Sequence, residues 1–182
     1  MMQSLAVFAL SGLVAGCGFH LRSTGDLKLP ESLASAHVDA RLLDSRLQNM
    51  MLDAWESAGG RQAEPDSDSP RLILFKEKID REILSVSSAD AKVSEYLLRY
   101  RLGFRMLDKN RQILAQDRYI KLRRSYTFDA NSVLAKEREQ EWLLEQLRLE
   151  AVRRIVHEVA RLETTKRETD MPEAGQEVRE EL

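Results

Sequence analysis

Basic side chains crowd one stretch of the chain. Between Arg99 and Arg124 there are nine Lys or Arg residues and only two acidic residues. Five of the basic residues fall on the polar positions of two adjacent segments in which polar and apolar residues alternate, so we expect them to share one face of a sheet. Guanidinium groups bind phosphate or carboxylate through paired hydrogen bonds. The spacing predicts a cationic face for an anionic partner, formed by Arg99, Arg101, Arg105, Lys121 and Arg123.

Two kinds of partner would suit this cationic face, an anionic glycolipid or an acidic protein wall. The plainer alternative is a solvated face whose charges only keep the protein soluble. Nucleic acid is not expected as a partner, because the strands lack the interleaved aromatic side chains of a base-stacking surface.

The single cysteine, Cys17, ends the only long uncharged apolar segment, Leu5–Cys17. That segment is too short to cross a bilayer as a helix, which takes about 20 residues, but it is typical of a signal peptide. Val14-Ala15-Gly16-Cys17 resembles the lipobox of bacterial lipoproteins, in which the thiol is acylated and the chain is cut before it. We therefore predict a signal peptide over residues 1–16 and an acylated Cys17. The alternative is a free thiol left by an ordinary signal peptide.

The surroundings of Cys17 also predict a location. In bacterial lipoproteins an Asp after the cysteine commonly marks retention at the inner membrane, and Gly18 stands there instead. We therefore expect a lipid anchor in the outer membrane, on its periplasmic side. Several acyl chains would hold a domain firmly, since each buried methylene contributes about 0.8 kcal/mol. Residues 1–4 contain no Lys or Arg, and we expect an upstream start to supply the usual basic segment.

The sequence contains no recognisable catalytic motif. A nucleophile elbow, a phosphate-binding glycine loop and a zinc-binding His-Glu-x-x-His pattern are all missing. His20, His37 and His157 fall on three separate segments, so surface or structural roles are expected. With Cys17 acylated, no thiol remains for a disulfide or a thiolate metal site. We predict a protein that is not an enzyme and needs no cofactor or metal.

Four strands must carry the basic residues. Alternating polar and apolar residues predict strands at residues 37–42, 95–106 and 117–128. A longer strand is predicted from Leu72 to Val86, with a bend or bulge between residues 78 and 82.

Two helices accompany these strands. Asp44 or Ser45 can cap the first, which ends at Gly59. Asn131 or Ser132 can cap the second, whose apolar residues recur at helical spacing as far as Leu162.

The order β-α-β-β-β-α predicts an α+β fold in which two helices cover one face of a four-stranded mixed sheet. The domain is expected over residues 31–163, after a lipidated tether at residues 17–30. The loop at residues 61–70 is expected to be solvated, because Pro, Ser and Asp dominate it. Residues 164–182 have no apolar period and are predicted to form a disordered acidic tail.

Several features in this order resemble the LptE family, the lipopolysaccharide-assembly lipoproteins of Gram-negative outer membranes. They are the lipobox with Cys17–Arg22, the order of elements, Arg124–Asp129 at a strand end and Leu134–Gln140 at a helix start. The resemblance implies a non-enzymatic domain that plugs and helps to assemble the β-barrel LptD. It also implies that this domain binds lipopolysaccharide for delivery to the cell surface. The polar lumen of such a barrel suits an ionic domain.

The resemblance further implies two basic residues that contact lipopolysaccharide. Lys136, in Leu134-Ala135-Lys136, matches one of them directly. The other lies in the turn before Glu95-Tyr96. Here that turn reads Ala89-Asp90-Ala91-Lys92, so the matching position is not basic and Lys92 is the residue that can substitute. Lys136 would stand in the first turn of a helix, where the helix dipole disfavours a cation, and this hints at a functional role. The alternative function is that of an unrelated periplasmic lipoprotein, acting as a lipid carrier or an envelope scaffold.

Overall fold

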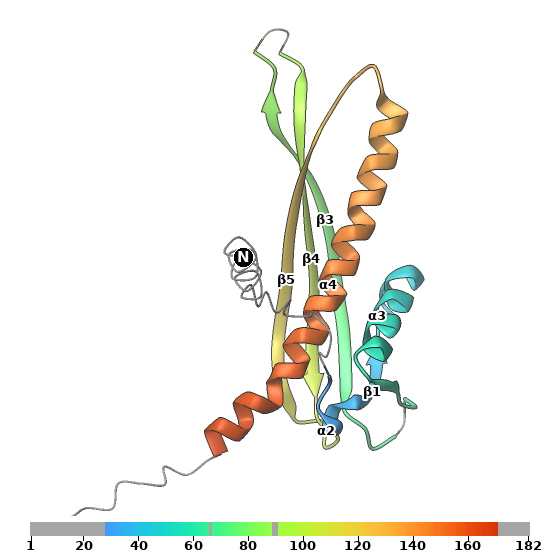
Figure 1. Cartoon of the computed structure of the whole chain (residues 1–182), viewed down its shortest axis with the longest axis vertical. Helices are drawn as coiled ribbons and strands as arrows, with labels where there is room; N and C mark the ends of the chain where they lie inside the picture. Colours follow the sequence, from blue (N-terminus) through green and yellow to red (C-terminus); the bar gives the residue numbers. More distant parts are fainter. Residues whose placement is uncertain (1–27, 66, 89–90, 171–182) are drawn as a thin grey trace, which may run out of the picture.

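The computed structural model describes residues 28–65, 67–88 and 91–170 of the chain (Figure 1). Cys17, the predicted signal peptide and most of the predicted tether lie outside these residues. The helices are α2 (Glu31–Ala34), α3 (Ser45–Ser57) and α4 (Val133–Asp170). The strands are β1 (Ser35–Asp39), β2 (Arg61–Gln62), β3 (Arg71–Val86), β4 (Val93–Leu107) and β5 (Ile113–Thr127).

The sheet is mixed, with the strand order β2-β1-β3-β4-β5. β1 pairs with β2 and β3 in parallel, and β3, β4 and β5 form an antiparallel meander. The α+β fold class is therefore confirmed. The meander strands are much longer than β1 and continue well beyond the N-terminal end of α3 (Figure 1).

Within the described residues the sheet has five strands rather than the predicted four, and there are three helices rather than two. The extra strand, β2, lies in the segment predicted to be a solvated loop, and two residues are too few to show a period. The Gln62 side chain extends its pairing, because its amide bonds the backbone N–H of Val38 at 3.1 Å and C=O at 3.3 Å. α2 is a single turn after Pro30 that buries Leu33.

The last helix also ends later than predicted. α4 continues to Asp170, past the domain boundary expected at residue 163. Residues 164–170 are therefore helical, and the rest of the predicted tail lies outside the described residues.

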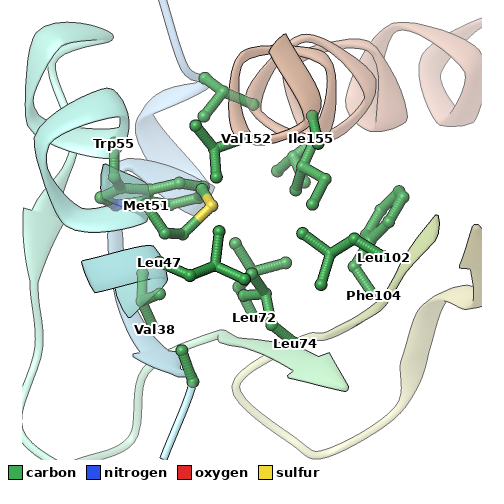
Figure 2. Packing of buried hydrophobic residues seen from close by; sticks show 14 of the residues in the cluster. Val38, Leu47, Met51, Trp55, Leu72, Leu74, Leu102, Phe104, Val152 and Ile155 are labelled. Carbon is green, nitrogen blue, oxygen red and sulfur yellow. The ribbon is translucent and has the colours of Figure 1, made fainter. Parts of the chain in front are cut away.

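Both long helices contribute to one core between themselves and the sheet (Figure 2). The Asp44 carboxylate accepts a hydrogen bond from the Arg46 backbone at 2.8 Å and caps α3 as predicted. Gly59 ends that helix with a φ of 79°. α3 contributes Leu47, Met51 and Trp55 to the core, and α4 contributes Leu147, Ala151, Ile155 and Val159.

β4 is the central strand of the meander, and its alternating pattern is confirmed. Leu98, Tyr100, Leu102, Phe104 and Met106 are all buried on the helix side. Gly103 lies on the other side, beneath the ring of Phe75, where an added Cβ would come within 2.5 Å of that ring. A larger residue at that position would push Phe75 away.

β3 contains a bulge, slightly before the predicted bend. Its register with β4 shifts between Phe75 and Lys78, and Lys76 has a φ of 53°. Leu72 and Leu74 face the helices before the shift, whereas Ile79 lies opposite Tyr100 after it. The bulge thus changes which residues of β3 face the core.

The bulge directs Glu77 toward α4, where it forms a largely buried ion pair with Arg148. The two hydrogen bonds are 2.8 and 3.2 Å long, and the side chains are 13% and 12% exposed. These bonds raise the pKa of Arg148. Burial, and then the charge of Glu77, raises the pKa of Tyr100 far above its usual value, so this neighbouring phenol stays neutral.

Glu77→Gln should destabilise the domain by about 3 kcal/mol, because it leaves the buried charge of Arg148 without a counter-ion. The double variant Glu77→Leu with Arg148→Met should lose much less. Urea unfolding measures both. Glu145→Gln is the matched control, since the Arg46–Glu145 pair is 63% and 43% exposed and should contribute below about 1 kcal/mol. Equal losses for Glu77→Gln and Glu145→Gln would contradict the assignment.

Candidate functional site

The cationic face lies on the side of the sheet away from the helices. Arg99 is directly opposite Arg123, and Arg101 is directly opposite Lys121. Their strand neighbours Leu98, Tyr100 and Leu122 are buried on the helix side, so the basic side chains project to the other side. The structure thus brings these four predicted residues together.

Some members of the cationic face already have counter-ions. Arg99 pairs with Glu82 at 2.8 Å and Arg105 with Asp117 at 2.6 Å. The guanidinium of Arg101 lies 5.4 Å from the centre of the Tyr119 ring. Within the described residues Lys121 and Arg123 have no ion-pair partner. The strongest positive charge therefore lies on β5 and the middle of β4.

Direct opposition of like charges has a cost. Cross-strand pairs of equal sign destabilise a sheet by up to about 1 kcal/mol. β4 and β5 place Arg99 opposite Arg123 and Arg101 opposite Lys121 on this side of the sheet. On β3, Lys78 is also opposite Arg101, whereas Asp80 is opposite Arg99 and offsets its charge. Alternating signs would keep the face soluble without that cost. The like-charge pairs are therefore a local cost to the stability of the sheet.

The second predicted site lies at the end of the molecule formed by the last residues of β3, the first of β4 and the first turns of α4, here called the distal end (Figure 1). Lys136 is held there between Glu139 Oε2 at 2.8 Å and Thr127 Oγ1 at 3.2 Å. Its side chain is only 20% exposed. Lys136 is therefore not the fully exposed lysine that is usual in the first turn of a helix.

Lys92 immediately precedes β4 and is exposed. The C=O of Ser94, two residues on, accepts a hydrogen bond from Phe128 N–H at 2.9 Å. Phe128 follows Thr127, which contacts Lys136. The structure thus brings Lys92 and Lys136 to the same distal end. It does not join them to the cationic face, because α4 covers the opposite side of the sheet.

The distal end also exposes apolar side chains that the sequence analysis did not single out. Ile83 and Val86 on β3 are 58% and 54% exposed, and Leu134 and Trp142 on α4 are 74% and 58% exposed. Leu134 and Trp142 could have been found from the sequence, because they lie outside the apolar stripe of α4. Exposed apolar groups next to lysines suit an anionic amphiphile.

Polar and aromatic contacts hold the distal part of α4 to the sheet. Gln140 Oε1 accepts hydrogen bonds from the Tyr126 hydroxyl at 2.7 Å and from Arg81 at 3.0 Å. The Arg81 guanidinium lies 4.7 Å from the centre of the Tyr96 ring, which packs on Tyr126 and Phe128. Gln140 therefore links α4 to both β3 and β5 through hydrogen bonds.

The described residues show neither a metal-binding cluster nor a membrane-spanning helix. The described residues contain no cluster of His, Cys, Asp or Glu that could hold a metal ion. In the same part of the chain, none of the helices has the length and apolar content needed to cross a membrane.

The fold is that of a class of bacterial lipoprotein domains. The crystal structure of rare lipoprotein B from Shewanella oneidensis is 26% identical, with a TM-score of 0.63 over 73% of this chain and 97% of that chain. The solution structure of an uncharacterized lipoprotein B from Nitrosomonas europaea shares the fold at 24% identity, with a TM-score of 0.67 over 84% and 97% of the two chains. Among curated proteins no sequence matches significantly.

The chain belongs to the LptE family. The sequence model of this family, described as lipopolysaccharide-assembly, matches residues 32–159. Membership supports a role as a lipopolysaccharide-assembly lipoprotein that is not an enzyme, and it suggests an association with the outer membrane.

Lys121→Glu should stabilise the domain by about 0.5 kcal/mol at low ionic strength, because it replaces a like-charge pair with Arg101 by an attractive one. Urea unfolding at low and high salt measures the effect, which should shrink as salt screens it. Lys109→Glu, in the β4–β5 turn, is the control with the same charge change. An equal effect of both changes would show that only net charge matters.

Proposed function

We propose that this protein is an outer-membrane lipoprotein, anchored on the periplasmic side through acylated Cys17. It occupies the lumen of the β-barrel LptD, helps that barrel to assemble, and binds lipopolysaccharide for delivery to the cell surface. The observation that carries this proposal is the family match over residues 32–159, because it covers almost the whole described domain.

The surface of the domain supports the barrel partner. The lumen of an outer-membrane barrel is polar, and a domain inside it must present ionic groups on several sides. Here the face of the sheet away from the helices carries the cationic face. The other side carries exposed ion pairs between β5 and α4, Arg118 with Glu158 and Arg124 with Glu150. Such a surface can contact a polar wall without burying an apolar patch.

The distal end supports the lipopolysaccharide site. Lipopolysaccharide combines phosphate groups with acyl chains, and the distal end combines Lys92 and Lys136 with exposed Ile83, Leu134 and Trp142. A phosphate could compete with the Glu139 carboxylate for the Lys136 ammonium, since ammonium groups form strong charge-assisted hydrogen bonds with both carboxylates and phosphates. The apolar residues would contact the acyl chains.

The lipid-carrier alternative calls for an enclosed apolar cavity. The cavity between β5 and α4 is open and is lined mainly by charged side chains, among them Arg124, Arg153 and Glu158. That lining favours the assembly role over the carrier role.

Affinity capture tests the partner. Tagged full-length protein, expressed in a Gram-negative host and recovered from solubilised outer membranes, should bring down a large β-barrel protein in about equal amount. Cys17→Ala should shift the protein from the membrane to the soluble periplasmic fraction, because the anchor is lost. Capture without any barrel protein would contradict the proposal.

Binding of purified lipopolysaccharide tests the distal site. Lys136→Asp should weaken binding about tenfold, a loss of about 1.4 kcal/mol, whereas Arg101→Asp should have a smaller effect. The change should not unfold α4, since an acidic residue suits the first turn of a helix.

The matched control for this measurement is Arg138→Asp, an exposed residue two positions further along α4. If the parent, Lys136→Asp and Arg101→Asp all bind equally, the site assignment is wrong. An equal loss for Lys136→Asp and Arg138→Asp would indicate a general effect of charge.

A further inference from the structure

β5 is the last strand of the sheet. No strand within the described residues pairs with its outer edge. At about 3.4 Å per residue, its fifteen residues form an edge about 50 Å long. Half of the backbone N–H and C=O groups of an edge strand point away from the sheet, where only another extended backbone can pair with all of them in register.

The part of β5 that borders the groove and the cationic face is a regular strand. Its register with β4 is continuous from Arg118 to Thr127. Residues 74–86 of β3 also form an edge, because β1 pairs only with residues 71–73. However, that stretch contains three register shifts and the positive φ of Lys76. Bulges of this kind interrupt pairing with a further strand, so β5 is the edge that can accept one.

A groove adjoins this edge. It lies between β5 and α4, is open to solvent and has a volume of about 620 Å³. Ile120 of β5 and Leu149 of α4 supply its apolar part. In recognition by strand addition, backbone bonds supply affinity and neighbouring pockets receive alternate side chains. This groove is positioned to receive them.

Cations border the edge on both sides of the sheet. Lys121 and Arg123 lie on the side away from the helices, as part of the cationic face. On the helix side the groove is lined by Arg124, Arg153 and Arg154.

The carboxylates on the helix side are already occupied by arginines. Glu150 bonds both Arg124 and Arg154, at 3.1 and 2.5 Å, and Glu158 bonds Arg118 at 2.8 Å. The surroundings of the edge are therefore basic overall.

We propose that β5 accepts an added strand from an extended acidic segment of another protein. Acidic side chains of that segment contact Lys121 and Arg123, and the apolar side chains between them enter the groove against Ile120 and Leu149. This interaction shares the cationic face with the proposed barrel partner, but it needs neither the lipopolysaccharide site nor Lys136, and the pairing of β5 with a further strand goes beyond the proposed function.

Other occupants fit less well. A second copy paired through β5 would bring its own Arg118, Lys121, Arg123 and Arg124 against the same residues, and like charges across strands repel. A lipid offers no backbone for the free N–H and C=O groups. Charged side chains on an edge strand oppose its pairing with other strands. Positive charges do not oppose pairing with an acidic strand, because the opposite charges attract.

Hydrogen exchange of the mature lipidated chain in detergent tests the proposal. The probe is a twelve-residue peptide of alternating Val and Glu, and its control is the same peptide with Lys in place of Glu. The acidic peptide should slow exchange in residues 113–127 at least about fivefold, because it protects the outward amides. It should leave residues 71–86 unchanged, and the Lys peptide should have no effect.

The double variant Lys121→Glu with Arg123→Glu should reverse the preference, so that β5 is protected by the Lys peptide. Unchanged exchange in β5, protection by both peptides, or protection confined to β3 would overturn the proposal. It would also be overturned if sedimentation of the peptide-free chain showed a dimer that the double variant abolishes or strengthens, since the occupant would then be a second copy. If the double variant still bound the acidic peptide, Lys121 and Arg123 would not be its contacts, and this would also overturn the proposal.

Discussion

The structure depends on the alternation of β4 more than on any other feature. One side of this strand is buried from Leu98 to Met106, and directly opposed residues of neighbouring strands share a face. β4 therefore decides which side chains of β3 and β5 face the helices and which face away. The clustering of Arg99, Arg101, Lys121 and Arg123 follows from that constraint, because all four lie in the polar phase of paired strands.

The bulge of β3 reconciles that strand with β4. Leu72 and Leu74, at even positions of β3, are buried against the helices, whereas beyond the bulge the odd positions Ile79 and Ile83 are 41% and 58% exposed. The bulge at Lys76 and Glu77 changes the phase. It also directs a carboxylate toward the core, where Arg148 supplies the counter-charge. The ion pair between β3 and α4 is thus a consequence of the register shift in β3.

The sequence predicted the elements with a clear period, and it missed those without one. α3, β4 and β5 could be predicted because each repeats its apolar residues several times. β2 and α2 are too short to repeat, so only three-dimensional pairing reveals them. The cationic face could be predicted because strand alternation alone assigns its residues to one side.

The environment of Lys136 could not be predicted in the same way. Its contact with Thr127 depends on how α4 turns back over β5, and no local pattern encodes that turn. The same holds for Arg118 and Arg124, which stand in the apolar phase of β5 and are accommodated by carboxylates of α4.

The short parallel pairing of β1 has a consequence for the order of folding. β3, β4 and β5 pair with their neighbours in the sequence, so many of their contacts are local, and such contacts form quickly. β1 reaches β3 only after the crossover through α3, and it pairs with three residues. We therefore expect the meander to form first and the β1–α3 unit to dock last. In a lipid-anchored chain, the part of the domain that follows the membrane anchor would then be the slowest to reach its native position.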